Sequence, residues 1–431
     1  MSLFRSTLEV SHHENSHPSA IPAEAGVHGS LILFSEAFLD TSSVRDSLPE
    51  QYRTQFDELR SDILAFCHDF NIPVETLRSK EAFGLELTSK RIPQERMAEA
   101  VSLFEHLEHL VTNKEPLKEK ENPIEYTDRL YHLSEQYTSQ VSLLERVGIL
   151  KDGAITGIDG NIYPIPTLEQ IAQRLYERQE ELETKRDQGF TKLLLVPFGM
   201  SLDALCKTLE QFLLAYKKDH SDFDLENDDP IWTLSNYKEA DTGESPELVY
   251  YPKFFDSKSL HGQTKTEILE EQAISSSSFP GWTVHLLQPS DPSNIHSPGF
   301  ASIPRLHKGK TYGEKNARPD LEAGRNINRH YFSNLQQEVK DDPTSPYFQE
   351  FGLTPEDWII AFITHLQETD KPLDDYGDGK ESVTYLAGVW FSSSSGMPCA
   401  YWSHTFLQVR LDKDDPHHQD ENIGVRFSVL V

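Results

Sequence analysis

The sequence is poor in cysteine. Its three cysteines, Cys67, Cys206 and Cys399, lie far apart among 431 residues, and no Cys-x-x-Cys pair occurs. A zinc site built on thiolates is therefore unsupported. The sparse, odd count favours a reducing compartment.

Positive charge is scarce as well. There are 40 Lys and Arg residues against 70 Asp and Glu residues, which gives a formal net charge of -30. A surface this acidic repels nucleic-acid phosphates and anionic lipid headgroups. We therefore expect neither nucleic acid nor a membrane among the partners of this protein.

Long apolar runs are also missing. None approaches the ~18 residues that cross a membrane. The first residues, MSLFRSTLEVSHHENSH, lack the apolar core of a signal peptide. These absences predict a cytoplasmic protein, and they leave non-classical export open.

Residues 1–30 are polar and are typical of a disordered tail. His12, His13 and His17 lie in this tail, so metal binding there stays open, although no fixed scaffold is predicted to hold the three side chains.

Residues 31–150 are predicted to form a helical bundle. Three stretches repeat apolar residues every three or four positions, which places them on one face of a helix. The three stripes are Tyr52, Phe56, Leu59, Ile63 and Phe66; Met97, Val101, Phe104, Leu107 and Val111; and Tyr126, Leu130, Leu133, Tyr137, Val141, Leu144 and Val147. Three such helices bury their stripes best against one another.

Residues 151–220 read as a helix-strand-helix segment that packs on the C-terminal domain. KDGAITGIDGNIYPIP has turn chemistry and predicts a small hairpin. Thr167 and Gln170 form a capping box at the start of a helix that runs to Leu182. KLLLVPF is a candidate buried strand, and another helix opens after Met200.

The region from 221 onward mixes short apolar runs with loops, except for one clear helix start at Thr354-Pro355. The tail from Thr384 reads as strands. The fold class predicted for the whole chain is therefore α+β.

Two motifs look like chemical sites but lack the required residues or geometry. The Gly309-Lys310-Thr311 run has Pro304 where a phosphate-binding loop needs glycine. The adjacent His417 and His418 would point to opposite faces of a strand, which disfavours a shared metal. No metal site and no cofactor are therefore predicted.

Two further possibilities remain weaker than ordinary turns and strands. Asp374, Asp375 and Asp378 look like part of a calcium loop, but an EF-hand starting at Asp374 would close on Tyr385 and not on glutamate, so only another kind of calcium site stays open. Cys399 has His404 in range as a base, but nothing recognisable orients that histidine.

The C-terminal sequence GVWFSSSSGMPCAYWSHTFLQVRL, followed by ENIGVRFSVLV, resembles the variable proteins of diversity-generating retroelements. The segments GIDGNIYPIP, KRDQGFTKLLLVPFGMSLDAL, LTPEDWIIAFITHLQET and DDYGDGK are similar to those preceding such tails in large proteins of small-genome bacterial lineages. The resemblance covers about residues 125–431. It implies that 221–431 form a C-type-lectin-like mixed α/β domain with irregular loops, related to formylglycine-generating enzymes, with a variable ligand-binding tail at 384–431.

In such systems, adenines of a template are copied with errors, so AAY codons scatter over many amino acids but never reach Trp, Gln, Glu, Lys or Met. Trp402, Gln408, Lys413 and Gln419 should therefore be fixed. The resemblance implies a framework of Trp390, Gly396, Pro398, Trp402, Arg410, Gly424 and Arg426. The candidates for diversified, ligand-binding positions are Cys399, Ala400, Tyr401, Ser403, His404, Phe406, Asp412, Asp414, His417, His418 and Asp420.

The expected function is therefore binding of a protein or surface ligand, without catalysis. Two alternatives stay open: a structural or assembly protein with an invariant tail, and an enzyme of the formylglycine-generating type. The enzyme would need a reactive cysteine pair or copper-binding thiols, and only Cys399 lies near the tail.

Overall fold

The computed structural model describes residues 41–78, 86, 90, 92–117, 121–252, 262–275, 278–303, 347–377, 382–393, 396–415 and 422–431. The chain divides into two compact units, Met1–Lys120 and Glu121–Val431. Helices and strands are both present, which confirms the α+β class. In the parts of the chain that are described, no helix combines the length and the apolar character needed to cross a membrane.

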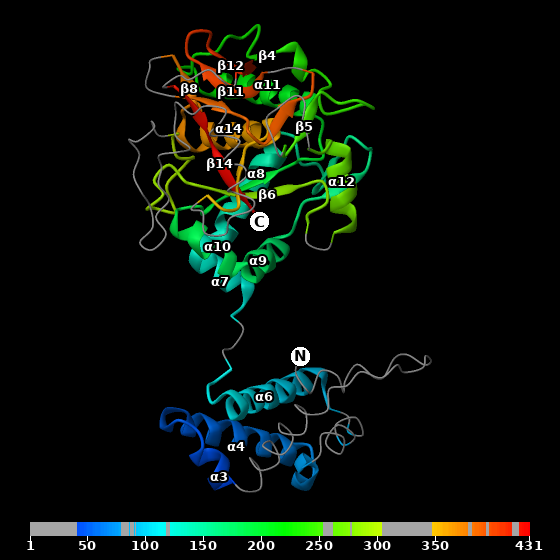
Figure 1. The fold of residues 1–431 in the computed structure, drawn as a ribbon, viewed down its shortest axis with the longest axis vertical. Coiled ribbons are helices and arrows are strands. Elements are labelled where there is room, and N and C mark those ends of the chain that lie inside the picture. Colours follow the sequence, from blue (N-terminus) through cyan, green and yellow to red (C-terminus); the bar gives the residue numbers. More distant parts are fainter. Residues whose placement is uncertain are drawn as a thin grey trace. The chain divides into compact units, whose positions relative to one another are not determined.

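The first unit is helical over its described residues (Figure 1). It contains α3 (Thr41–Asp46), α4 (Arg53–Asp69) and α6 (Gln94–Asn113), with short 3-10 helices at Glu50–Tyr52 and Val74–Arg78. The first two predicted stripes lie on α4 and α6, which contact each other. Their inward side chains, including Phe56, Ile63, Phe104 and Leu107, are fully or almost fully buried in one cluster.

The third predicted helix does not join this unit, and it is two helices. The chain breaks at His132 between α7 (Pro123–Tyr131) and α8 (Leu133–Arg146), and both helices bury their stripes in the core of the second unit. Hydrogen bonds from two glutamines attach α8 to the second unit. The Gln136 and Gln140 side chains accept hydrogen bonds from the backbone N–H groups of Leu193 and Leu195, at 2.8 and 2.7 Å. Apolar periodicity gives no sign of this pairing.

The helix predicted from Thr167 to Leu182 is also divided, into α9 (Leu168–Glu177) and α10 (Gln179–Asp187). The predicted capping box of Thr167 and Gln170 is confirmed, and so is the hairpin before it, which consists of β1 (Ala154–Thr156) and β2 (Ile162–Pro164). The strand predicted at KLLLVPF is β3 (Lys192–Val196), and the helix after Met200 is α11 (Leu202–Asp219).

Two sheets organise the rest of the second unit. One is four-stranded, in the order β3, β6 (Thr283–Leu287), β14 (Phe427–Leu430) and β7 (Glu350–Gly352). The other is six-stranded, and its main path runs β13 (Ile423–Val425), β9 (Val383–Tyr385), β11 (Met397–Ser403), β12 (Gln408–Asp414) and β4 (Ile231–Thr233). Its sixth strand, β8 (Asp375–Tyr376), pairs with β11. β5 (Leu248–Tyr250) and β10 (Val389–Phe391) form a separate pair.

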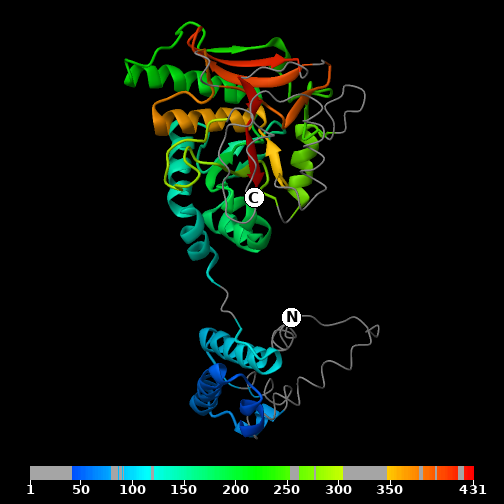
Figure 2. The same ribbon diagram turned by 60° about the vertical axis from the view of Figure 1, so that its left-hand side comes forward.

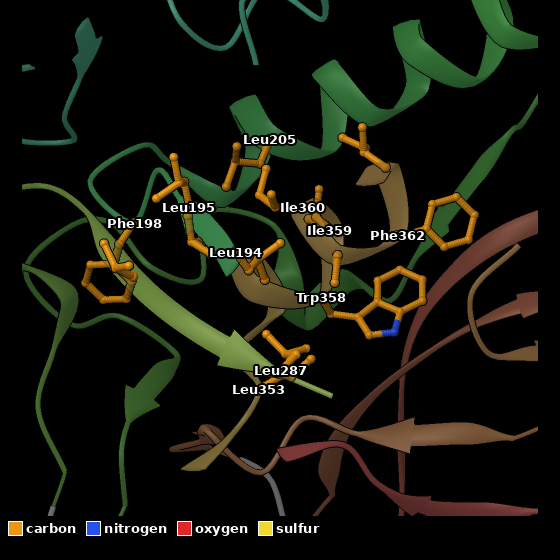
Figure 3. Close-up of a cluster of buried hydrophobic side chains, with 14 of the residues drawn as sticks. Leu194, Leu195, Phe198, Leu205, Leu287, Leu353, Trp358, Ile359, Ile360 and Phe362 are labelled. Atoms are coloured by element: carbon orange, nitrogen blue, oxygen red, sulfur yellow. The ribbon is translucent and has the colours of Figure 1, made fainter. Parts of the chain in front are cut away.

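Two helices lie between these sheets. Figure 2 shows α11 and α14 (Pro355–Thr369) beneath the six-stranded sheet, while α12 (Lys265–Ile274) lies at one side. The Thr354 capping box at the start of α14 is confirmed. α14 is buried on nearly every side because it contacts both α11 and β3. Leu194 of β3, Leu205 of α11 and Ile360 of α14 meet in the core (Figure 3).

The segment predicted as one last strand, IGVRFSVLV, passes from one sheet to the other. β13 belongs to the six-stranded sheet and β14 to the four-stranded sheet, and Arg426 lies at the break between them. Its guanidinium donates to the Asp374 carboxylate at 2.7 Å and to the Ala301 carbonyl. Both charged side chains are almost fully buried, so this ion pair fixes the crossing point.

We predict that Trp402→Ala destabilises the second unit. The indole is 2% exposed and packs between Phe223 and Phe362, with ring centroids at 5.2 and 6.2 Å. Truncating a buried Trp costs about 3–5 kcal/mol in unfolding free energy, which chemical denaturation measures. The matched control is Ile274→Ala, because Ile274 is 88% exposed, and it should change stability by less than about 0.5 kcal/mol. Equal stability of both variants would contradict this packing role.

We also predict a pH dependence that comes from His365. Burial, assisted by the charge of Arg426, lowers its pKa from 6.5 to about 4, and its Nδ1 accepts a hydrogen bond from the Phe300 N–H at 2.9 Å. Between pH 6.5 and 4 the unfolded chain binds this proton and the folded chain does not. Stability should therefore fall as the pH falls through this window, by up to roughly 3 kcal/mol. His365→Asn, which keeps an acceptor, should flatten that part of the stability profile; an unchanged slope would assign it to other groups.

Candidate ligand-binding surface

The C-terminal tail forms an antiparallel hairpin of β11 and β12. Side chains alternate between the two faces of a strand, so the pairing decides which residues share a face. Tyr401 is paired with Arg410, and Arg410 is paired in turn with Trp232 of β4. These three residues therefore form a row across three adjacent strands on the same face.

The opposite face of the hairpin is core. Ala400, Trp402, Val409 and Leu411 are almost fully buried in the main hydrophobic cluster of the second unit, together with α11 and α14. The hairpin is therefore held from beneath by packed apolar side chains. None of the three residues of the Tyr401–Arg410–Trp232 row belongs to this cluster.

Aromatic side chains gather around the Tyr401–Arg410–Trp232 row. We call this group the aromatic surface, and it consists of Trp232, Tyr376, Tyr401, His404, Phe406 and Arg410. The Tyr376 ring meets the Tyr401 ring edge-on at 5.5 Å. The Arg410 guanidinium lies 4.0 Å from the Trp232 ring centroid and 5.1 Å from that of Phe406. Phe406 is 57% exposed and Tyr376 is 38% exposed, so apolar rings face solvent here.

A tight connection between β11 and β12 presents His404 and Phe406. Leu407 has a left-handed backbone (φ 54°), its N–H donates to the Ser403 carbonyl at 2.7 Å, and the Phe406 N–H donates to the Ser403 hydroxyl. From outside the hairpin, the Glu226 N–H donates to the Leu407 carbonyl at 2.8 Å. The turn is therefore fixed on both sides while its side chains point outward.

The polar groups of the aromatic surface include the His404 imidazole and the Tyr401 phenol. His404 Nδ1 lies 3.6 Å from Asp375 Oδ1, and Gly377 leaves the room for this approach, since a Cβ there would lie 2.5 Å from the Cβ of His404. Burial raises the pKa of Tyr401 to about 12, so its phenol is a neutral hydrogen-bond donor at physiological pH. The surface thus offers one guanidinium and neutral donors among aromatic rings.

The diversified candidates separate into different environments. Tyr401, His404 and Phe406 belong to the aromatic surface, and Asp412 and Asp414 are partly exposed on β12. His417, His418 and Asp420 lie outside the described residues.

Three of the candidates are corrected by the fold. Cys399, Ala400 and Ser403 are only 2%, 0% and 3% exposed, so this fold does not present them to a ligand. A codon does not record whether the folded chain covers a residue, and here Cys399 and Ser403 are covered although they share the strand face of Tyr401. Ala400 faces the helices, while Cys399 is covered by a second apolar cluster that includes Tyr385 and Trp390.

The predicted framework residues are buried, with one exception. The buried set is Trp390, Gly396, Pro398, Trp402, Gly424 and Arg426. Position 396 favours glycine, because a Cβ there would lie 2.7 Å from the Lys413 side chain. Arg410 differs, since its guanidinium lies among the rings of the aromatic surface and not beneath them.

Sequence reasoning missed Trp232 and Tyr376. Each lies on a strand of only two or three residues, in regions read as irregular. Nothing in their local sequence shows that β4 and β8 pair with strands of the tail hairpin that lie about 180 and 27 residues further along the chain, respectively.

The cysteine-nucleophile possibility fails on burial. The Cys399 thiol is buried, and burial raises its pKa well above 9, so it stays a thiol. A thiolate is the reactive form. Cys206, with a pKa raised to about 12 by burial, is unreactive for the same reason.

Asp374, considered above for calcium, has protein partners. Its carboxylate accepts from Arg426, from the Trp358 indole N–H at 2.9 Å and from the Ser382 hydroxyl at 3.4 Å. Its backbone carbonyl accepts from the Trp402 N–H at 3.0 Å. Asp374 therefore ties α14 and the terminal crossing to the strand that carries Tyr401. Asp378 lies outside the described residues.

Comparisons of this chain with protein-family models, with curated proteins and with solved structures find no match. The assignment of a function therefore rests on the geometry above.

We predict that Arg426→Met costs about 3–5 kcal/mol of unfolding free energy, because it leaves the Asp374 carboxylate buried without its cation. The double variant Arg426→Met/Asp374→Asn removes both charges and keeps an acceptor for Trp358. It should be more stable than Arg426→Met alone, and denaturation of all four species gives the coupling energy. Strictly additive losses would mean that the pair is not coupled.

Proposed function

We propose that the second unit is a C-type-lectin-like domain of a diversity-generating-retroelement variable protein, carried by an N-terminal helical bundle. Its function is to bind a protein or surface ligand through the aromatic surface. The observation that carries the proposal is the row of Trp232, Arg410 and Tyr401, flanked by exposed Phe406, over a buried and rigid layer.

The composition of the aromatic surface supports binding. Trp, Tyr and Arg are the residues that most often dominate the energy of protein interfaces. Large aromatic side chains also bury much area for little loss of rotational freedom. Arg410 is already held between two rings, so little ordering remains when a ligand covers it.

The burial of side chains in the hairpin supports diversification. AAY codons cannot reach Trp402, which lies on the core face, or Gln408, which is covered on the other face; both are almost fully buried. Tyr401, His404 and Phe406, which AAY codons can reach, are exposed or partly exposed. Changes at the outer positions leave the layer beneath them intact. A scaffold of this kind tolerates many ligand-contacting sequences.

Binding is proposed in preference to catalysis. The formylglycine-generating chemistry of the same fold family needs a reactive cysteine pair or copper-binding thiols. The one cysteine of the tail, Cys399, is buried and protonated. His404 of the aromatic surface lies beside the Asp375 carboxylate, and the six described residues that define this surface include no serine, threonine or cysteine.

The test is the DNA around the gene. We predict a nearby copy of the segment that encodes residues 384–431, differing from the gene at adenines of the copy, together with a reverse-transcriptase gene. Codons for Tyr401, His404 and Phe406 should differ between the gene and its copy, and between sister genes. Codons for Trp402 and Gln408 serve as the internal control and should be identical.

A complete locus without such a repeat and without a reverse transcriptase would overturn the diversification proposal. If the aromatic residues are also invariant among sister genes, the tail is a fixed interface. The protein would then be better described as a structural or assembly component, with its helical unit contributing to that assembly.

A further inference from the structure

We infer that the second unit carries a binding site for a divalent transition-metal ion, of which zinc is the representative, on the side chains of His132, Glu135 and His296. One ligand atom from each residue can be chosen so that all three lie within 4.8 Å of one another. Within the described residues this is the one group of three or more such side chains that converges in this way. It is separate from the aromatic surface and does not depend on the proposed function.

The site joins two parts of the chain that are distant in sequence. His132 lies at the break between α7 and α8, and Glu135 follows in the first turn of α8, three positions later and thus on a neighbouring part of the helix surface. His296 comes from the loop after β6, which in Figure 2 is the yellow-green loop lying beside the teal helix α8. The two imidazole rings face each other at 4.1 Å between centroids, with 56° between their planes.

The backbone that carries His132 and Glu135 is fixed by other contacts. His132 has a left-handed backbone (φ 49°), a conformation that costs a non-glycine residue free energy. Asp128 holds this break because its carboxylate accepts from both the N–H and the hydroxyl of Ser134, at 2.8 Å each. The Gln136 side-chain amide also donates a hydrogen bond to the Tyr131 carbonyl at 2.6 Å.

The loop that carries His296 is fixed as well. The His296 N–H donates to the Asn294 side chain at 3.1 Å, and the buried Ser297 hydroxyl accepts from the Asp291 N–H at 2.8 Å. Gly189 allows this loop to pack closely, since a Cβ there would lie 2.6 Å from Pro292. Both halves of the site are therefore held in place before any ion binds.

The donor set selects the class of ion. Two imidazoles and one carboxylate are ligands for zinc and neighbouring transition ions, whereas calcium and magnesium prefer oxygen ligands alone. His296 and Glu135 are exposed and His132 is partly exposed, which gives an ion a direct route from solvent and leaves a fourth position for water. No hydrogen bond to another described side chain competes for the Glu135 carboxylate or the His296 ring.

An ion bound here would cross-link two elements of the second unit. It would link α8, whose glutamines pair with β3, to a loop that continues directly into contacts with α14. In that continuation, the Gly299 and Phe300 N–H groups donate to Glu368 and His365. The expected effect of the ion is therefore stabilisation of the second unit, because binding to the folded form alone raises its stability.

The experiment uses the untagged full-length chain and ZnCl2 as the probe. Isothermal titration calorimetry gives the stoichiometry and affinity, and the melting temperature is measured with and without zinc. We expect one ion bound per chain, with a rise in melting temperature. His296→Asn should weaken binding by more than the roughly 10–100-fold that loss of an outer-shell partner causes, because it removes a direct ligand. The same variant should abolish the zinc-induced rise in melting temperature.

Three further variants make the result specific. Glu135→Gln should also weaken binding, and it keeps the test valid if His296→Asn fails to fold. His404→Asn is the matched control, because that exposed histidine also has a carboxylate nearby, at 3.6 Å, but belongs to no three-ligand group. The triple variant His12→Asn/His13→Asn/His17→Asn removes the histidines of the N-terminal tail. Both of these control proteins should still bind one zinc ion with unchanged affinity.

Cobalt gives an independent readout, since Co2+ bound by imidazole and carboxylate in a tetrahedral site absorbs strongly in the visible range and hydrated Co2+ does not. This absorption should appear in the natural chain and be absent in His296→Asn. The inference is overturned if the natural chain binds no zinc. It is equally overturned if His296→Asn and Glu135→Gln both bind zinc as the natural chain does, or if only the tail variant loses binding.

Discussion

The buried ion pair between Arg426 and Asp374 is the contact on which the arrangement of the second unit depends. It lies where the chain leaves the six-stranded sheet and enters the four-stranded one, and Asp374 also receives the indole N–H of Trp358 from the helix between the sheets. The next residue, Asp375, pairs with β11 and approaches His404. The Asp374 carboxylate and its neighbours thus position the core helix α14, the chain crossing from β13 to β14, and the aromatic surface. A buried pair of this kind contributes more to fixing a geometry than to net stability.

Sequence patterns predicted local structure correctly where it is determined by residues close to one another in the sequence. The capping boxes at Thr167 and Thr354, the buried strand β3 and the two stripes of α4 and α6 are all present. The patterns failed where the packing of an element is determined by a partner distant in sequence. Nothing local shows that Gln136 and Gln140 bind the edge of β3, so the helices from 123 to 146 were assigned to the wrong unit.

The residues of the aromatic surface were predictable only in part, again because partners distant in sequence decide which side chains are exposed. Codon chemistry selected Tyr401, His404 and Phe406 together with Cys399, Ala400 and Ser403. Strand pairing places only Ala400 on the core face, whereas Cys399 and Ser403 share the face of Tyr401 and are covered there by other parts of the fold. Trp232 and Tyr376 reach the surface through short strands from elsewhere in the chain. Sequence spacing does not indicate the proximity of His132 and His296, because their side chains meet only after folding.

The order of strands in the four-stranded sheet has a kinetic consequence. β14 lies between β6 and β7, and its partners come from about 140 and 75 residues upstream. Closing such long loops is entropically expensive and is repaid only after the strands pair, so folding of this unit should be slow for its size. The tail hairpin lies between β7 and β14 in the chain, and its outer side chains do not take part in that pairing. If these positions bind a ligand, as proposed, substitutions there would change the binding and leave the folding rate unchanged.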